Sequence, residues 1–274
     1  MVVPDRPDAP DLSLPEPARV YDYMLGGAHN FAADRAFAER LLDALPGVRD
    51  AAVANRAFLG RAVRTCLERG CRQFLDLGSG IPTAEPVHEI ARRHDPSARV
   101  AYVDKEPVAV AMSREILSGV QGVTITAADL TDPDAVLGAP GVADLLDPAE
   151  PTAVLAVSVL HFVRDDALLA DLFDRYCGAV GPGSLLVVSH GSTDVDDARA
   201  AEEMRTIERF TRDSAQPAVA RDRETLGRLL LDRPGHRVDL IEPGLVDVSR
   251  WRVDPGQEPG RTVGMYALVG EIVR

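Results

Sequence analysis

Short apolar runs alternate along the chain with longer segments in which apolar residues recur every three or four positions. Runs of the first kind are typical of buried strands, and the second spacing places apolar residues on one face of a helix. The apolar runs predict seven strands, at 74–76, 99–104, 122–128, 151–158, 184–189, 236–241 and 262–273. The helical spacing predicts helices near 18–25, 34–45, 50–69, 84–93, 166–176, 196–210 and 221–231.

This alternation predicts an α/β fold: a Rossmann-like, seven-stranded, mostly parallel sheet with helices on both faces and one reversed strand. Residues 1–17 are rich in Pro and Asp, lack apolar periodicity and are expected to form a flexible tail. Residues 18–70 are expected to form an N-terminal helical lid or subdomain. Residues 71–274 would form the main domain, with a helical insertion at about 194–233.

Composition argues against several functional classes. The net charge of the 274 residues is −13 and no run of Lys or Arg occurs, so nucleic acid is not an expected partner. Cys66, Cys71 and Cys177 have no metal-ligand spacing, so no metal is expected and the thiols should be free, as in a reducing cytosol. No run approaches the roughly 20 apolar residues that span a bilayer, and residues 1–6 lack a signal-peptide layout. We therefore expect a cytoplasmic protein without a membrane partner, and the oligomeric state stays open.

The segment 74–83 carries the densest chemical pattern. Its apolar run closes on Asp76, Gly78 and Gly80 follow, and Thr83 is the expected cap of a helix over 84–93. Glycine can take positive φ in a tight turn and has no side chain to block a ligand at the backbone. The pattern indicates a strand, a ligand-binding loop and a helix start.

Two further acids end the next two strands. Asp104 follows the second apolar run, and Asp129 lies just past the third. In doubly wound sheets an acid at the tip of the second strand can accept both hydroxyls of a ribose. An acid after the third strand can accept a hydrogen bond from the exocyclic amine of an adenine. The three strand ends are expected to meet at one edge of the sheet.

These residues, in this order, resemble the class I S-adenosylmethionine (SAM)-dependent methyltransferases, although Pro82 replaces the usual third glycine. The nicotinamide-binding fingerprint fits less well, because it needs a third Gly after two intervening residues. The proline suits the first turn of a following helix.

The N-terminal segment narrows the resemblance. Residues 18–27 (ARVYDYMLGG) and 29–35 (HNFAADR) closely resemble the start of an actinobacterial family of SAM-dependent methyltransferases, formerly a domain of unknown function. The resemblance includes Pro82 and covers nearly the whole chain. In that family the N-terminal segment is expected to help enclose the cofactor. A helix-turn-helix that only packs against the sheet is the alternative.

The resemblance implies a role for each candidate residue. The glycines would lie along the methionine part of SAM with Asp76 bracing their loop, Asp104 would hold the ribose, Asp129 the adenine amine, and Ser158 the pocket floor. The complete cofactor-binding set is Tyr21, Gly26, Asn30, Asp76, Gly78, Ser79, Gly80, Asp104, Lys105, Asp129, Leu130 and Ser158.

His161, after the fourth strand, is the one candidate general base. A neutral imidazole could take a proton from a substrate hydroxyl or amine. A histidine that only packs the cofactor pocket is the alternative, and methyl transfer can proceed by orientation alone. His190 is a second pocket candidate, for which packing is the commoner role. Asn55 and Arg56 could also reach the site, although such residues more often form a solvated helix face.

The predicted function is SAM-dependent methyl transfer to a small-molecule acceptor. Two alternatives stay open: a non-catalytic sensor that binds SAM or S-adenosylhomocysteine (SAH), and a nicotinamide-dependent oxidoreductase, against which Pro82 and Asp129 argue. The sequence does not identify the acceptor or say whether O, N or C is methylated.

Overall fold

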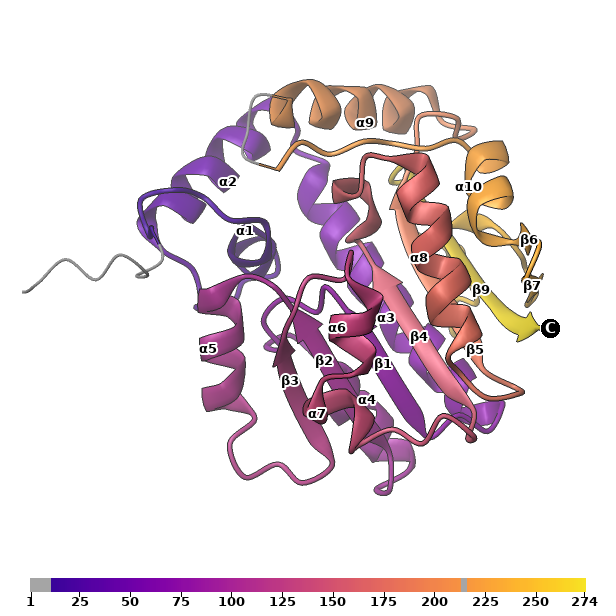
Figure 1. The fold of residues 1–274 in the computed structure, drawn as a ribbon. Coiled ribbons are helices and arrows are strands. Elements are labelled where there is room, and N and C mark those ends of the chain that lie inside the picture. The colour runs from indigo at the N-terminus through magenta and orange to yellow at the C-terminus, as the bar shows by residue number, and fades with distance from the viewer. Residues whose placement is uncertain (1–10, 213–215) are drawn as a thin grey trace, which may run out of the picture.

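The computed structural model describes residues 11–212 and 216–274, and in these ranges one sheet forms the centre of the molecule (Figure 1). Its strands, in chain order, are β1 (Gln73–Leu77), β2 (Arg99–Asp104), β3 (Val123–Ala127), β4 (Thr152–Val157), β5 (Leu185–Gly191), β6 (Asp232–Arg233), β7 (His236–Leu240), β8 (Val246–Asp247) and β9 (Met265–Val273). The spatial order is β3-β2-β1-β4-β5-β9-β7-β6, and β8 pairs with β9. The strands from β3 to β5 are parallel, and β9 runs antiparallel to both of its long neighbours, β5 and β7.

The sheet of the described residues has nine strands, so the prediction of seven strands was wrong. The seven longer strands correspond to the seven predicted ones, and β9 is the expected reversed strand. The two additional strands contain two residues each. Such strands are too short to leave an apolar run in the sequence. They arise because a neighbouring strand supplies hydrogen-bonding partners.

Helices cover both faces of the sheet. Their bounds are α1 (Pro17–Met24), α2 (Ala32–Ala44), α3 (Val48–Glu68), α4 (Val87–His94), α5 (Pro107–Ile116), α6 (Pro133–Leu137), α7 (Pro140–Ala143), the 3₁₀ turn η1 (Leu160–Phe162), α8 (Asp166–Gly178), α9 (Ala198–Thr211) and α10 (Arg223–Leu230). Figure 1 shows α8 and α10 in front of the sheet and α3 behind it, while α1, α2 and α9 lie over its upper end. None of the helices in the described ranges combines the length and apolar character that crossing a membrane requires.

The alternation of side chains along β1 explains the two cores. Phe74 belongs to the cluster behind the sheet, with α3 and α4, whereas Leu75 and Leu77 belong to the cluster under α8 and α10. Successive residues of a strand point to opposite faces, so a strand that is apolar throughout is buried on both. A third cluster joins α1, α2 and the start of α3. The N-terminal helices therefore have an apolar core of their own.

Six of the seven predicted helix starts differ from the structure by one to three residues. The helix expected at 84–93 begins at Val87, after Pro86, and Thr83 does not cap it. The residue before a proline avoids helical geometry, and Glu85 has a φ of 47°. The helix expected at 50–69 is α3. Its N-cap is Gly47, and Asp50 lies within its first turn.

Candidate functional site

A pocket lies where the parallel strands end, and most of the predicted site residues line it. We call it the strand-end pocket. The predicted residues in its wall are Tyr21, Gly78, Ser79, Gly80, Asp104, Lys105, Asp129, Leu130, Ser158 and His161. Gly26, Asn30 and Asp76 are not in the wall. The loop ends of β1 to β4 thus converge as expected of an open α/β sheet.

The glycine loop after β1 is held by the end of β2. The backbone N–H groups of Gly78 and Ser79 donate to the carbonyl of Val103, at 2.8 and 3.0 Å. The N–H of Gly80 donates to Oδ2 of Asp104 at 2.7 Å. Gly78 has a φ of 67°, and a Cβ there would lie 2.2 Å from Cγ2 of Val159. The bracing contacts of the loop therefore come from β2, not from Asp76.

The carboxylate of Asp104 is buried and can accept further hydrogen bonds. Its Oδ1 accepts from the N–H of Glu106 at 2.9 Å, and its side chain is almost fully enclosed. Burial raises the pKa of its carboxyl, and hydrogen bonds from Glu106 and Gly80 oppose the rise. Each carboxylate oxygen can accept a second hydrogen bond. The carboxylate can therefore bind a pair of ligand hydroxyls while it continues to hold the glycine loop.

Asp129 has more hydrogen-bond partners than Asp104, and its side chain is more exposed. Its Oδ1 accepts from the N–H and Oγ1 of Thr131 at 2.9 and 2.8 Å, and its Oδ2 lies 3.2 Å from Nζ of Lys105. Partial burial raises the pKa of Asp129, but the hydrogen bonds from Thr131 and Lys105 lower it more. Asp129 is therefore an anion held in place in the pocket wall.

Asp76 lies near the end of β1 and is not in the wall of the strand-end pocket. Its side chain is buried, and no described residue donates a hydrogen bond to its carboxylate. Burial raises the pKa of Asp76 to about 7, although the Arg56 guanidinium counteracts part of the rise. A buried carboxylate with no hydrogen-bond donor destabilises the empty protein once it is ionised.

We expect Asp76→Asn to stabilise the ligand-free protein at pH 8, and to do so by a smaller amount at pH 5, which lies between the ordinary pKa of an Asp carboxyl and the raised pKa of Asp76. A raised folded-state pKa means that the contribution of Asp76 to stability is present below its unfolded value and is lost as the pH rises through about 7. The gain at pH 8 should be about 1–3 kcal/mol in urea denaturation. Asp129→Asn is the control of opposite sign, because the pKa of Asp129 is lowered. Loss of stability in Asp76→Asn at both pH values would contradict this account.

A chain of hydrogen bonds connects α1 to the end of β4. Asn55 donates from Nδ2 to the hydroxyl of Tyr21 at 2.9 Å, and its Oδ1 accepts from Oγ of Ser189 at 2.6 Å. Oγ of Ser189 accepts in turn from the N–H of Ser158 at 2.9 Å. Ser158 has a φ of 56°, which is unfavourable for a residue other than glycine. The chain therefore fixes the strained turn that precedes His161.

Ser189 and Ser184 form a matched pair that tests this chain. Both are fully buried, and each hydroxyl accepts a backbone N–H of the β4 segment at 2.9 Å, from Ser158 and Thr152 respectively. We expect Ser→Ala at either position to cost about 1–2 kcal/mol of stability. Only Ser189→Ala should also weaken binding of SAH, the ligand that the sequence resemblance implies, by about threefold or more in calorimetry, because only it releases the turn in the pocket wall. Equal affinities of the two variants would exclude this positioning role.

His161, in η1, has a free imidazole. No described residue forms a hydrogen bond with its ring nitrogens, and the residue lines the strand-end pocket. Burial, with a smaller contribution from Arg221, lowers the pKa of His161 to about 4. The ring is therefore neutral near pH 7 and can accept a hydrogen bond or a proton.

Both ring nitrogens of His190 form hydrogen bonds within the protein. Arg221 donates to its Nε2 at 3.0 Å, so we assign the proton to Nδ1, which donates to the carbonyl of Gly191 at 2.8 Å. Its side chain is fully buried and lines neither of the cavities described in this section. Both ring nitrogens are occupied, which supports the packing role for this histidine.

Asp22 organises the segment that follows α1. Its Oδ1 accepts from Oγ1 of Thr83 at 2.8 Å, and its Oδ2 accepts from the N–H of His29 and from Nδ2 of Asn30, at 2.8 and 2.9 Å. Asp22 lines the pocket, whereas Asn30 supports it from outside, and Gly26, with a φ of 79°, follows the end of α1. Thr83 thus connects the loop after β1 to α1 instead of capping α4.

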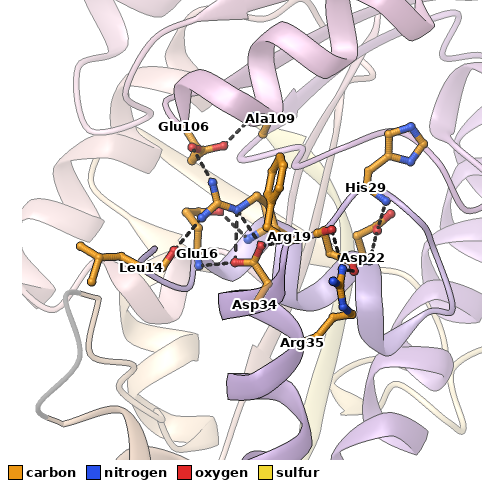
Figure 2. Close-up of polar contacts among 12 residues, drawn as sticks. Leu14, Glu16, Arg19, Asp22, His29, Asp34, Arg35, Glu106 and Ala109 are labelled. Carbon is orange, nitrogen blue, oxygen red and sulfur yellow. Dashed lines mark hydrogen bonds and ion pairs between the residues drawn. The ribbon is translucent and has the colours of Figure 1, made fainter. Parts of the chain in front are cut away.

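A buried arginine anchors α1 (Figure 2). Nε of Arg19 lies 3.1 Å from Oδ2 of Asp34 in α2, and its Nη1 lies 3.6 Å from Oε1 of Glu106, the N-cap of α5. Nη2 donates to the carbonyl of Leu14 at 2.8 Å, and the guanidinium lies over the ring of Phe31. One side chain therefore fastens α1 to α2 and to the start of α5.

A second, apolar cavity adjoins the strand-end pocket. It has a volume of about 470 Å³ and lies between α1, α2, the start of α3 and α9. The residues that line both cavities are Glu16, Pro17, Tyr21, Ser158, His161, Phe162 and Gln216. His161 therefore stands at the junction of a polar pocket and an apolar one.

Sequence reasoning missed several pocket residues. Glu16, Asp22 and Gln216 line the strand-end pocket and were not predicted, and Arg56, noted only as able to reach the site, also lines it. Asp22 lies within the segment 18–27 that carries the family resemblance, but its position in the sequence gives no separate sign of a binding role. Glu16 and Gln216 reach the pocket from segments that are distant in sequence and joined by a 3.3 Å contact. Within the described ranges, no group of three His, Cys, Asp or Glu residues could hold a metal ion.

Comparison with known proteins places this site in context. A family model described as S-adenosyl methyltransferase matches residues 5–273. A Thermobifida fusca YX protein described as a "putative methyltransferase" is 33% identical, with a TM-score of 0.88, and the match covers 99% of this chain and 100% of that one. A DUF574 family protein from Streptomyces avermitilis MA-4680 is 30% identical, with a TM-score of 0.84 and coverage of 95% and 98%. No match was found among curated proteins.

Proposed function

Because this chain belongs to the S-adenosyl methyltransferase family, we propose that it transfers the methyl group of SAM to a small molecule in the apolar cavity. It is a SAM-dependent methyltransferase with the fold of its class, and family membership favours an enzyme over a sensor. The nature of the acceptor is our proposal, and so are the roles of the residues given below. The observation that carries it is the apolar cavity, which meets the strand-end pocket at His161.

The strand-end pocket fits SAM by its donors, acceptors and charge. In this proposal Asp104 would accept hydrogen bonds from the two ribose hydroxyls, and Asp129 would accept one from the adenine amine. Gly78, Ser79 and Gly80 would lie along the methionine part. Four acids line the pocket, Glu16, Asp22, Asp104 and Asp129, against two basic residues, Arg56 and Lys105. An excess of acids suits a ligand that carries a sulfonium and an ammonium group.

We further propose that α1 and α2 act as the lid. Tyr21 and Asp22 come from α1 and line the pocket, and Ala18 lies 3.5 Å from where a Cβ on Gly80 would be. A lid in this position would exclude water from the reacting atoms. SAM supplies the electrophilic methyl group; His161 would accept the proton of an attacking hydroxyl or amine.

The acceptor class can be tested with SAM that carries a tritiated methyl group. Purified protein is incubated with a small-molecule extract, with total protein and with total RNA, and each reaction is separated into acid-precipitable and soluble fractions. We expect label in new soluble compounds only with the small-molecule extract. Label in precipitable protein or RNA would overturn the proposal. Calorimetry with SAM, SAH and NAD establishes the cofactor independently, and the family predicts preference for SAM and SAH.

A further inference from the structure

The charged groups that line the apolar cavity are all of one sign. Among the described residues of its wall, the ionisable side chains other than His161 and Tyr21 are Glu16 and Glu208, and neither Lys nor Arg is present. The remaining wall is largely aliphatic and aromatic, with Phe37, Met204 and Ile207 among its members. The strand-end pocket differs, since Arg56 and Lys105 line it. A ligand with a carboxylate or phosphate would have no counter-charge in the apolar cavity.

The two carboxylates have acceptor capacity left. Glu208 accepts from the N–H of Ala220 at 2.7 Å. Glu16 accepts from the N–H of Ala18 at 2.8 Å and from Gln216 at 3.3 Å, and it lies at the junction of the two cavities. Burial raises the pKa of Glu16 to about 7, with nearby Glu106 and Asp104 adding to the rise. A positive group placed beside Glu16 would relieve both effects.

We propose that the methyl acceptor is a largely apolar amine without carboxylate or phosphate groups, bound in the apolar cavity with its nitrogen beside Glu16 and His161. This inference rests on the proposed methyl transfer. An amine that binds as its ammonium first loses a proton to water. The nitrogen lone pair then forms the new N–C bond while the C–S bond breaks and its electron pair stays on sulfur. The positive charge passes from sulfur to nitrogen, where Glu16 can stabilise it. The N-bound proton then leaves to Glu16, His161 or water.

The test uses matched probes on SAH-saturated protein, measured by calorimetry. Two scaffolds each carry three head groups: naphthylmethylamine, naphthylmethanol and naphthoate, and decylamine, decanol and decanoate. We expect each amine to bind at least about tenfold more tightly than the carboxylate of its scaffold. Equal or tighter binding of the carboxylates overturns the inference, as does failure of both amines to bind. If SAH itself does not bind, the proposed function fails instead.

Substitutions in the apolar cavity test whether the amine probes bind there. Glu208→Gln should reduce the amine preference by about threefold or more, whereas Glu202→Gln, on the exposed face of α9, should leave it unchanged. Ile207→Trp fills the apolar cavity and should abolish probe binding while SAH still binds, and Ala218→Leu is a milder second variant. Unchanged probe binding in both filling variants would place the probes elsewhere and overturn the inference.

Discussion

Asp104→Ala should weaken the affinity for SAM and SAH by at least about 100-fold. The carboxylate is proposed to accept two ribose hydroxyls, and hydrogen bonds to a charged group contribute roughly 1.5–3 kcal/mol each. The same carboxylate holds the N–H of Gly80 at 2.7 Å, so its removal also loosens the glycine loop. Calorimetric titration of SAH measures the loss.

Asp129→Ala is the matched control for this experiment. Its carboxylate is 40% exposed and already shared with Thr131 and Lys105, so we expect a loss of about tenfold or less. Circular dichroism would establish that both variants are folded. If folded Asp104→Ala binds SAH within threefold of the unsubstituted protein, the ribose-binding role is wrong.

Arg19→Met should lower the free energy of unfolding by about 3–5 kcal/mol. The substitution keeps much of the side-chain volume but leaves Asp34, which is fully buried, and Glu106 without their cation. Removing one partner of a buried ion pair strands the other charge in a poorly solvated site, which costs about this much. Figure 2 shows that both carboxylates converge on this one guanidinium. Urea denaturation followed by circular dichroism gives the change.

Arg35→Met is the control, because Arg35 is exposed and donates only to Asn30; its cost should stay within about 0.5 kcal/mol. Because Arg19 fastens α1, which carries Tyr21 and Asp22, Arg19→Met should also weaken SAH binding. Limited proteolysis of the folded variant would show earlier cleavage near α1 if that helix loosens. A variant as stable as Arg35→Met would exclude the anchoring role of Arg19.

Local patterns along the chain were enough to predict the α/β fold and its parallel strands. The run ending in Asp76, the two glycines and the acids Asp104 and Asp129 are short-range signals. Parallel strands bring their carboxyl ends to one edge whatever the rest of the fold does. The predicted bounds of β2 agree with the structure at both ends. Apolar periodicity did not reveal that α4 begins only after Pro86, nor did it reveal the two-residue strand β6.

The sequence by itself thus determined the class of fold, the strand-end residues and the family resemblance that the comparisons confirm. Only the tertiary structure brought Glu16 to Gln216, Arg19 to Glu106 and Asn55 to Ser189, pairs that are 87 to 200 residues apart. It also decided that Thr83 bonds Asp22 and that an apolar cavity forms beside His161. The physical reason is that burial and hydrogen bonding between distant segments depend on how helices pack over the sheet. Neither residue spacing nor local propensity encodes that packing.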